Sequence, residues 1–403
     1  MEGPVRLERI LPFLSLTVFL DLVGFGIILP LLPSYVGEMG GSATTVGVLF
    51  ASFAAAQFVA TPTLGRISDR FGRRRVIVVS LGANAIAMAL FSVAASRHAL
   101  WLLFASRIVA GATSGNIGAC QAAIADVADG AERTRAMGKL GAGIGLGMML
   151  GPWIGGRVST LGEIAPPITA GILAFIALIG VVVFMPETNP VITAADNAHL
   201  PTRRPKLELA KLASSPKILI VMVLYFLTFF YMTNLQTALA LLASDRFHWG
   251  KEHIGDLFGL FGLVTLVVQL GIVGPVSTRF AARSAVAAAA VLSAVGLLGI
   301  GVSPTTPVMI GGIVVLALGL GLTQPLLASL ASQYAGAGQQ GTVLGFAQAS
   351  GSLARALGPL LWGAMYQHLG PVASFVGGSV AALGVCFVSL AGGRATSEST
   401  EQA

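Results

Sequence analysis

The stretch Ile10–Leu32, ILPFLSLTVFLDLVGFGIILPLL, is long enough to cross a membrane and contains one charged residue, Asp21. A helix of about 20 apolar residues spans the hydrocarbon core of a bilayer. Placing an aspartate at the centre of such a span costs roughly 2.5–3.5 kcal/mol. A carboxylate kept at that position usually takes part in proton or ion transfer. The alternative is an acid that a neighbouring helix neutralises for packing alone.

The composition extends this interpretation to the whole chain. Of 403 residues, 55% are hydrophobic and only 10% are charged, which is too little charge to cover the surface of a soluble protein. Helices satisfy their own backbone hydrogen bonds in lipid. We therefore expect an all-α integral membrane protein with twelve transmembrane helices, at residues 10–33, 45–64, 76–96, 99–123, 137–158, 166–185, 216–243, 254–275, 284–302, 306–330, 341–366 and 371–391.

The net charge of +7 reflects membrane topology rather than a nucleic-acid partner. Eighteen of the 24 lysines and arginines fall in the termini and in alternate loops, and the intervening loops hold four. Basic residues accumulate on the cytoplasmic side of membrane proteins. Both termini are therefore expected in the cytoplasm.

The sequence indicates that the chain consists of two similar halves. Residues 186–215 form a polar linker, so we expect a six-helix bundle over 1–185 and a second one over 216–403 with a short cytoplasmic tail. Residues 128–152 align without gaps on 335–359, an offset of 207, and residues 65–74 align on 274–283, an offset of 209. Near-equal offsets favour a duplicated unit and two pseudo-symmetric bundles. Repeats of this kind place a binding site near the membrane midplane, between the halves.

The loop after the second span reads GRISDRFGRRR from Gly65 to Arg75. Glycine permits a tight turn between helices, and an acid here can pair with arginine or face a helix N-terminus. The spacing favours a conformational latch over a loop that is charged for topology alone. Its predicted members are Gly65, Asp69, Arg70, Gly72, Arg73 and Arg74.

This loop resembles the signature of the major facilitator superfamily. DLVGFGIILPLLP from Asp21 resembles the first-span motif of its twelve-span drug:proton antiporters, and RIVAG from Arg107 resembles their fourth-span motif. The similarity is greatest to tetracycline efflux transporters, which implies a bacterial inner membrane protein. It also implies that Asp126 bonds the loop's arginines. The glycine-rich fifth span resembles the antiporter motif, which implies a hinge and a seal against proton leak at Gly143, Gly147, Gly151, Pro152, Gly155 and Gly156; ordinary small-residue packing is the alternative.

Arg107 lies within the fourth span, where a guanidinium needs a carboxylate, a carbonyl or water. Asp21 is a plausible partner. A nearby cation favours the charged form of a carboxyl and burial favours the neutral form, so the pair could load and release a proton. The resemblance implies the same role; a static ion pair that fixes helix packing is the alternative.

Polar and aromatic residues within the spans suit a mostly apolar pocket for an amphipathic compound. The predicted cavity residues are Gln57, Phe230, Tyr231, Asn234, Gln236, Thr265, Gln269, Gln324, Gln348 and Arg355. Thr265 stands where the tetracycline transporters carry a histidine, and Arg355 has no counterpart in their pattern. Arg355 could pair with Asp256 or attract an anionic substrate.

These features predict a secondary transporter, and not an enzyme, that exports an amphipathic drug-like compound in exchange for protons by alternating access. The alternative is a proton-coupled symporter or uptake carrier for a small neutral or anionic metabolite. The sequence has no Walker A motif and no metal-ligand spacing, so we expect no cofactor and no metal, with the proton gradient as the energy source. The expected partners are a small-molecule substrate, protons and the lipid bilayer, and a monomer suffices.

Overall fold

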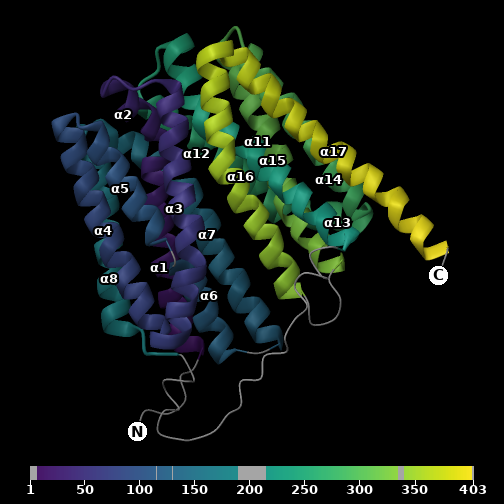
Figure 1. Cartoon of the computed structure of the whole chain (residues 1–403), viewed down its shortest axis with the longest axis horizontal. Coiled ribbons are helices and arrows are strands. Elements are labelled where there is room, and N and C mark those ends of the chain that lie inside the picture. Colours follow the sequence, from purple (N-terminus) through teal and green to yellow (C-terminus); the bar gives the residue numbers. More distant parts are fainter. Residues whose placement is uncertain (1–6, 115, 129, 189–214, 335–339, 402–403) are drawn as a thin grey trace, which may run out of the picture. The chain divides into compact units, whose positions relative to one another are not determined.

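The computed structural model describes residues 7–114, 116–128, 130–188, 215–334 and 340–401 (Figure 1). All twelve predicted spans fall on helices. The first half contains α1 (Leu7–Ile28), α2 (Leu32–Glu38), α3 (Ala43–Phe71), α4 (Arg73–Arg97), α5 (Leu100–Ala112), α6 (Asn116–Val127), α7 (Gly130–Ser159) and α8 (Ala165–Phe184). The second half contains α11 (Pro216–Phe247), α12 (Lys251–Val267), α13 (Val273–Arg279), α14 (Ala282–Val302), α15 (Thr306–Tyr334), α16 (Gln340–Leu369) and α17 (Pro371–Glu401).

Three predicted spans are not single α-helices. A 3₁₀ turn at Leu29–Leu31 joins α1 to α2, and a π-helical turn at Val268–Ile272 joins α12 to α13. The prediction of one continuous helix over 99–123 is wrong, because α5 ends at Ala112 and α6 begins at Asn116. Thr113 and Ser114 at this break bond their hydroxyls to backbone carbonyls. Such local bonds compete with the helical ladder.

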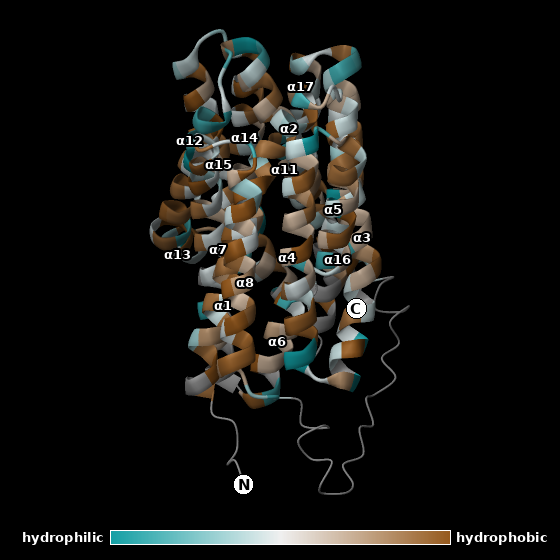
Figure 2. Cartoon of the chain, turned by 90° about the vertical axis from the view of Figure 1, so that its left-hand side faces the viewer, coloured by the Kyte–Doolittle hydropathy of each residue, from teal (hydrophilic) through white to brown (hydrophobic). Residues whose placement is uncertain are grey.

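The helices carry the apolar surface that a membrane requires. In the described part of the chain, nine helical segments are long and apolar enough to cross a bilayer. Figure 2 shows hydrophobic residues along the lengths of the helices and hydrophilic ones gathered toward helix ends. On α8 all the large exposed side chains except Phe184 follow helical spacing along one side: Ile168, Ile172, Phe175, Ile176, Ile179, Val182 and Val183. Such a continuous apolar face suits contact with lipid.

By packing, the chain divides into two compact units. Unit 1 comprises Met1–Gly40, Ser52–Arg203 and Gly250–Gly259, and unit 2 comprises Gly41–Ala51, Arg204–Trp249 and Leu260–Ala403. The first turns of α3 and of α12 are thus grouped with the half that does not contain them in sequence. Domain boundaries at 185 and 216 stay a prediction.

The two units pair their helices in the same way. In unit 1, α1 packs on α7 and α8, and α4 packs on α8 and α5. In unit 2, α11 packs on α16 and α17, and α14 packs on α17 and α15. When the predicted spans are numbered from one to six within each half, every helix contact of the first half recurs between the corresponding helices of the second. This pattern agrees with the duplication inferred from the sequence offsets.

The α1/α7 contact is built from glycine. A Cβ on Gly143, Gly147 or Gly151 would lie 3.0, 2.9 or 2.6 Å from the carbonyl oxygen of Ser15, Phe19 or Val23, respectively. The glycine one turn further, Gly155, meets the Ile27 carbonyl in the same way. From Gly143 to Gly155, glycines four residues apart on α7 therefore lie against backbone carbonyls four residues apart on α1. Small residues at this spacing let helix backbones approach closely. We call this contact the glycine seam.

Candidate functional site

Asp21 is partly buried on α1, within the stretch of that helix that forms the glycine seam with α7. The Asn84 side chain on α4 donates a hydrogen bond from Nδ2 to Asp21 Oδ1 at 3.0 Å. Asn116, which is 3% exposed and begins α6 directly after the break, is its second side-chain partner. Two neutral amides therefore hold the carboxylate, and within the described part of the chain it makes no ion pair.

Arg107 on α5 is 3% exposed, yet it does not contact Asp21. Its guanidinium carbon lies 5.0 Å from the centre of the Phe91 ring, and its nitrogens approach Ser106 Oγ at 3.5 Å and Met88 Sδ at 3.7 Å. The predicted Asp21–Arg107 ion pair is therefore absent from the described structure. The physical reason is that asparagine amides satisfy the acid, while an aromatic face receives the cation.

A second polar cluster surrounds the start of α4. Arg73 Nε donates to Asp126 Oδ2 at 2.9 Å, and Arg73 Nη1 bonds Ser68 Oγ at 3.2 Å. The Arg73 and Asp126 side chains are only 10% and 15% exposed. This is the expected contact between Asp126 and the arginines of the 65–75 loop. Its role as a latch stays a prediction.

Glu187, two residues into the predicted linker, completes this cluster and was not identified from the sequence. Its carboxylate accepts hydrogen bonds from the backbone N–H groups of Arg73 at 2.9 Å and Arg74 at 3.3 Å. An acid at a helix N-terminus satisfies otherwise unpaired donors and the helix dipole. Gly72 has φ +110°, a conformation that favours glycine, and a Cβ there would also meet this carboxylate. An acid two residues after an apolar span was the available signal.

The other predicted latch residues lie around this cluster. Arg74 donates to the carbonyl of Val182 on α8, and the exposed Arg70 lies over the Phe71 ring at 5.3 Å. Gly65 has open space around it. The side chain of Asp69 lies outside the described residues.

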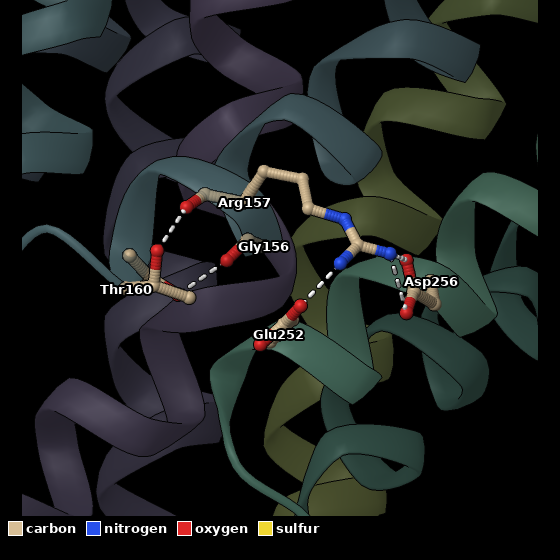
Figure 3. Close-up of polar contacts among 6 residues, drawn as sticks. Gly156, Arg157, Thr160, Glu252 and Asp256 are labelled. Carbon is tan, nitrogen blue, oxygen red and sulfur yellow. Dashed lines mark hydrogen bonds and ion pairs between the residues drawn. The ribbon is translucent and has the colours of Figure 1, made fainter.

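The end of α7 meets the start of α12 in a close crossing. A Cβ on Gly156 would lie 2.9 Å from Gly255 Cα, and Arg157 beside it reaches Asp256 at 2.9 Å and also Glu252 (Figure 3). Within unit 1, Arg157 therefore binds Asp256, the residue suggested as a partner of Arg355.

The predicted cavity residues separate into two groups. Tyr231 and Asn234 are fully buried: Tyr231 bonds Ser293 on α14 at 3.2 Å, and Asn234 donates to Ser374 on α17. Both connect helices of unit 2 in this structure, and their assignment to a substrate cavity stays a prediction. The remaining members keep some exposed surface: Gln57, Phe230, Gln236, Thr265, Gln269, Gln324, Gln348 and Arg355.

The family model described as Major Facilitator Superfamily matches residues 14–250 and 221–402. The chain belongs to this superfamily. It is 31% identical to the class C tetracycline resistance protein of Escherichia coli over 355 residues, covering 87% of this chain and 88% of that one. It is 29% identical to the human major facilitator superfamily domain-containing protein 10 over 417 residues, covering 91% and 90%.

Solved structures agree with the fold. The human organic anion transporter MFSD10 matches with a TM-score of 0.70 at 27% identity, covering 95% of this chain and 99% of that one. A bacterial homologue of the lysosomal transporter Spinster, 13% identical with coverage of 96% and 97%, gives a TM-score of 0.77 and shows the fold alone. The chain is therefore a multi-pass membrane transporter for small molecules, and not an enzyme.

Proposed function

We propose that this member of the superfamily exports a small amphipathic compound in exchange for protons. The observation that carries the proposal is Asp21, an acid inside a membrane span whose described partners are the amides of Asn84 and Asn116. An amide has both N–H and C=O groups, so it can donate to a carboxylate and accept from a carboxylic acid. Both protonation states of Asp21 can therefore be satisfied at one position.

Arg107 is proposed as the second member of the proton pathway. Its charge is buried in the same unit and rests on the Phe91 ring rather than on an acid. A rearrangement of unit 1 that brings Arg107 to Asp21 would favour the charged acid and expel its proton. We propose that such a rearrangement accompanies alternating access, and that Arg73, Asp126 and Glu187 stabilise one of the alternating states.

The relatives support export of a drug-like compound and leave a second candidate open. Tetracycline resistance proteins favour the exporter, and the human organic anion transporter favours a carrier of anions. We further propose that the chain is a monomer in a bacterial inner membrane with both termini in the cytoplasm, which the distribution of its basic residues supports.

A drug-susceptibility panel in an exporter-deleted bacterial host tests the proposal. The native chain should protect against at least one antibacterial compound, and Asp21→Asn should remove the protection at equal expression. Glu163→Gln, which changes an exposed acid of unit 1, should protect like the native chain. Everted membrane vesicles that contain the native protein should then release accumulated protons when that compound is added. Protection that persists in Asp21→Asn would refute proton coupling through this residue.

A further inference from the structure

Arg355 places a positive charge at the middle of α16. It lies 15 residues after Gln340 and 14 before Leu369, about 20 Å from either end of the helix. A charge at such a depth within a membrane span is costly, and spans rarely keep one without a use. With the offset of 207 between the halves, the corresponding residue of α7 is Met148. The repeated fold therefore does not require an arginine at this position.

Helix α16 presents three different faces. Leu353, Leu357 and Leu360 are large exposed apolar residues on one face, which suits lipid. A second face of small residues packs inward, namely Ala347, Gly351, Ala354 and Gly358. The third face is polar and holds Gln348, Ser352 and Arg355. At about 100° per residue, Arg355 is turned about 160° away from Leu353 and Leu357. The guanidinium therefore points away from the apolar exposed face.

The contacts of Arg355 hold it at this depth without neutralising it. Its guanidinium carbon lies 4.5 Å from the centre of the Phe229 ring on α11, and Nη2 donates to Ser352 Oγ at 2.9 Å. Gly351 presses against the same ring, because a Cβ there would lie 2.9 Å from Phe229 Cε2. Among the described residues of unit 2, no carboxylate lies within ion-pair distance of Arg355. A guanidinium has five N–H donors, and Ser352 occupies one of them.

We propose that Arg355 binds the anionic group of the transported compound, so that the substrate is an amphipathic organic monoanion with an aromatic or apolar body. A carboxylate or sulfonate would accept two parallel N–H bonds from the guanidinium fork. The Phe229 ring would contact the apolar body, and the exposed amide of Gln348 on the same face of α16 would offer a further donor. This inference rests on the proposed transport of a small amphipathic compound and assigns its charge.

Three dansyl probes that differ mainly in charge test the inference: dansylglycine is an anion, dansylglycinamide is neutral and dansylethylenediamine is a cation. Equilibrium dialysis uses the full-length protein in nonionic detergent, with protein-free micelles as the blank. The native chain should bind dansylglycine at least about tenfold more tightly than the other two. Arg355→Met, which installs the residue of the first repeat, should weaken dansylglycine binding about tenfold and leave dansylglycinamide binding unchanged.

Two further variants keep the result decisive. Arg355→Lys retains the charge and should keep part of the preference for the anion. Arg97→Met removes an exposed arginine at the end of α4 and should bind all three probes like the native chain. Equal weakening of the anion and the amide in Arg355→Met would identify a purely structural arginine and overturn the proposal. So would a native chain that binds none of the probes, or that shows no preference for the anion.

The same assay separates this inference from proton coupling. Asp21→Asn should keep the preference for dansylglycine even though it no longer exchanges protons. If Asp21→Asn still exchanges protons while Arg355→Met loses the preference, the coupling proposal fails and the anion site stands. The reverse pattern, with coupling lost in Asp21→Asn and the preference intact in Arg355→Met, leaves proton exchange standing and removes the anion site.

Discussion

The glycine seam between α1 and α7 makes a quantitative prediction for Gly151→Ala. The new Cβ would lie 2.6 Å from the Val23 carbonyl oxygen and 2.7 Å from Gly26 Cα. Both are backbone atoms, so the two helices must move apart to make room for the methyl group. The cost in free energy of unfolding is expected at the upper end of the roughly 1–3 kcal/mol typical of overpacking. The higher helix propensity of alanine offsets about 1 kcal/mol of this cost. The expected net loss is about 2 kcal/mol.

Gly145→Ala is the matched control on the same helix, since a Cβ there meets nothing within 4 Å. This variant gains the propensity term alone, so the two alanine variants should differ by about 3 kcal/mol. For a unit of this size, 1 kcal/mol shifts Tm by about 2–4 °C. Gly151→Ala should therefore melt about 6–12 °C below Gly145→Ala.

A thiol-reactive fluorescent dye can measure this difference. Cys120 is fully buried in unit 1, and replacing the partly exposed Cys386 with serine leaves Cys120 as the reporter. The dye should react as unit 1 unfolds, so the melting curve follows the unit that contains the seam. Equal melting temperatures for the two alanine variants would refute the proposed packing of α7 on α1.

Two further predictions concern ion pairs. Asp126→Asn removes the charge that faces Arg73 in a mostly buried ion pair, where a charge-assisted hydrogen bond contributes roughly 1.5–3 kcal/mol. Transport of a compound identified in the susceptibility panel should fall at least about tenfold, while binding of that compound persists. Unchanged transport would exclude the latch. Arg157→Gln breaks the ion pairs to Glu252 and Asp256. Because the three side chains are 39–49% exposed, the free energy of unfolding should fall by less than about 1 kcal/mol. In the dye assay Tm should therefore move by less than about 4 °C. A larger shift would show that this crossing depends on charge more than on glycine packing.

The sequence was most informative where one residue type dominates a segment. Long apolar runs predicted twelve spans, and all of them fall on helices, because the bilayer imposes one solution on such segments. The glycine-rich fifth span was predicted to be a hinge and a seal against proton leak, with small-residue packing as the alternative. The structure shows close packing of these glycines on α1, and the hinge stays a prediction. The break at Thr113 and Ser114 was missed because the apolar run continues through it, and only the bonds made by these hydroxyls show the interruption.

Side-chain partners were harder to predict than positions. Asp21 and Arg107 were both recognised as buried charges, but attraction between opposite charges suggested a pair that the described structure does not contain. The partners of Asp21 are Asn84 and Asn116, which are neutral and distant in the sequence. Glu187 was missed because it follows the last apolar residue of a span, where an acid is also expected for solubility alone.

The backbone-to-backbone character of the glycine seam has a mechanical consequence. Interdigitating side chains help to fix the axial register of two helices. At the four glycines of α7 the contact is made mainly with backbone carbonyls of α1, and the side chains of Leu22 and Pro152 also take part. A movement of α1 along α7 would therefore meet fewer interlocked side chains than a contact between large residues, and the bonds of Asp21 to Asn84 and Asn116 would have to change with it.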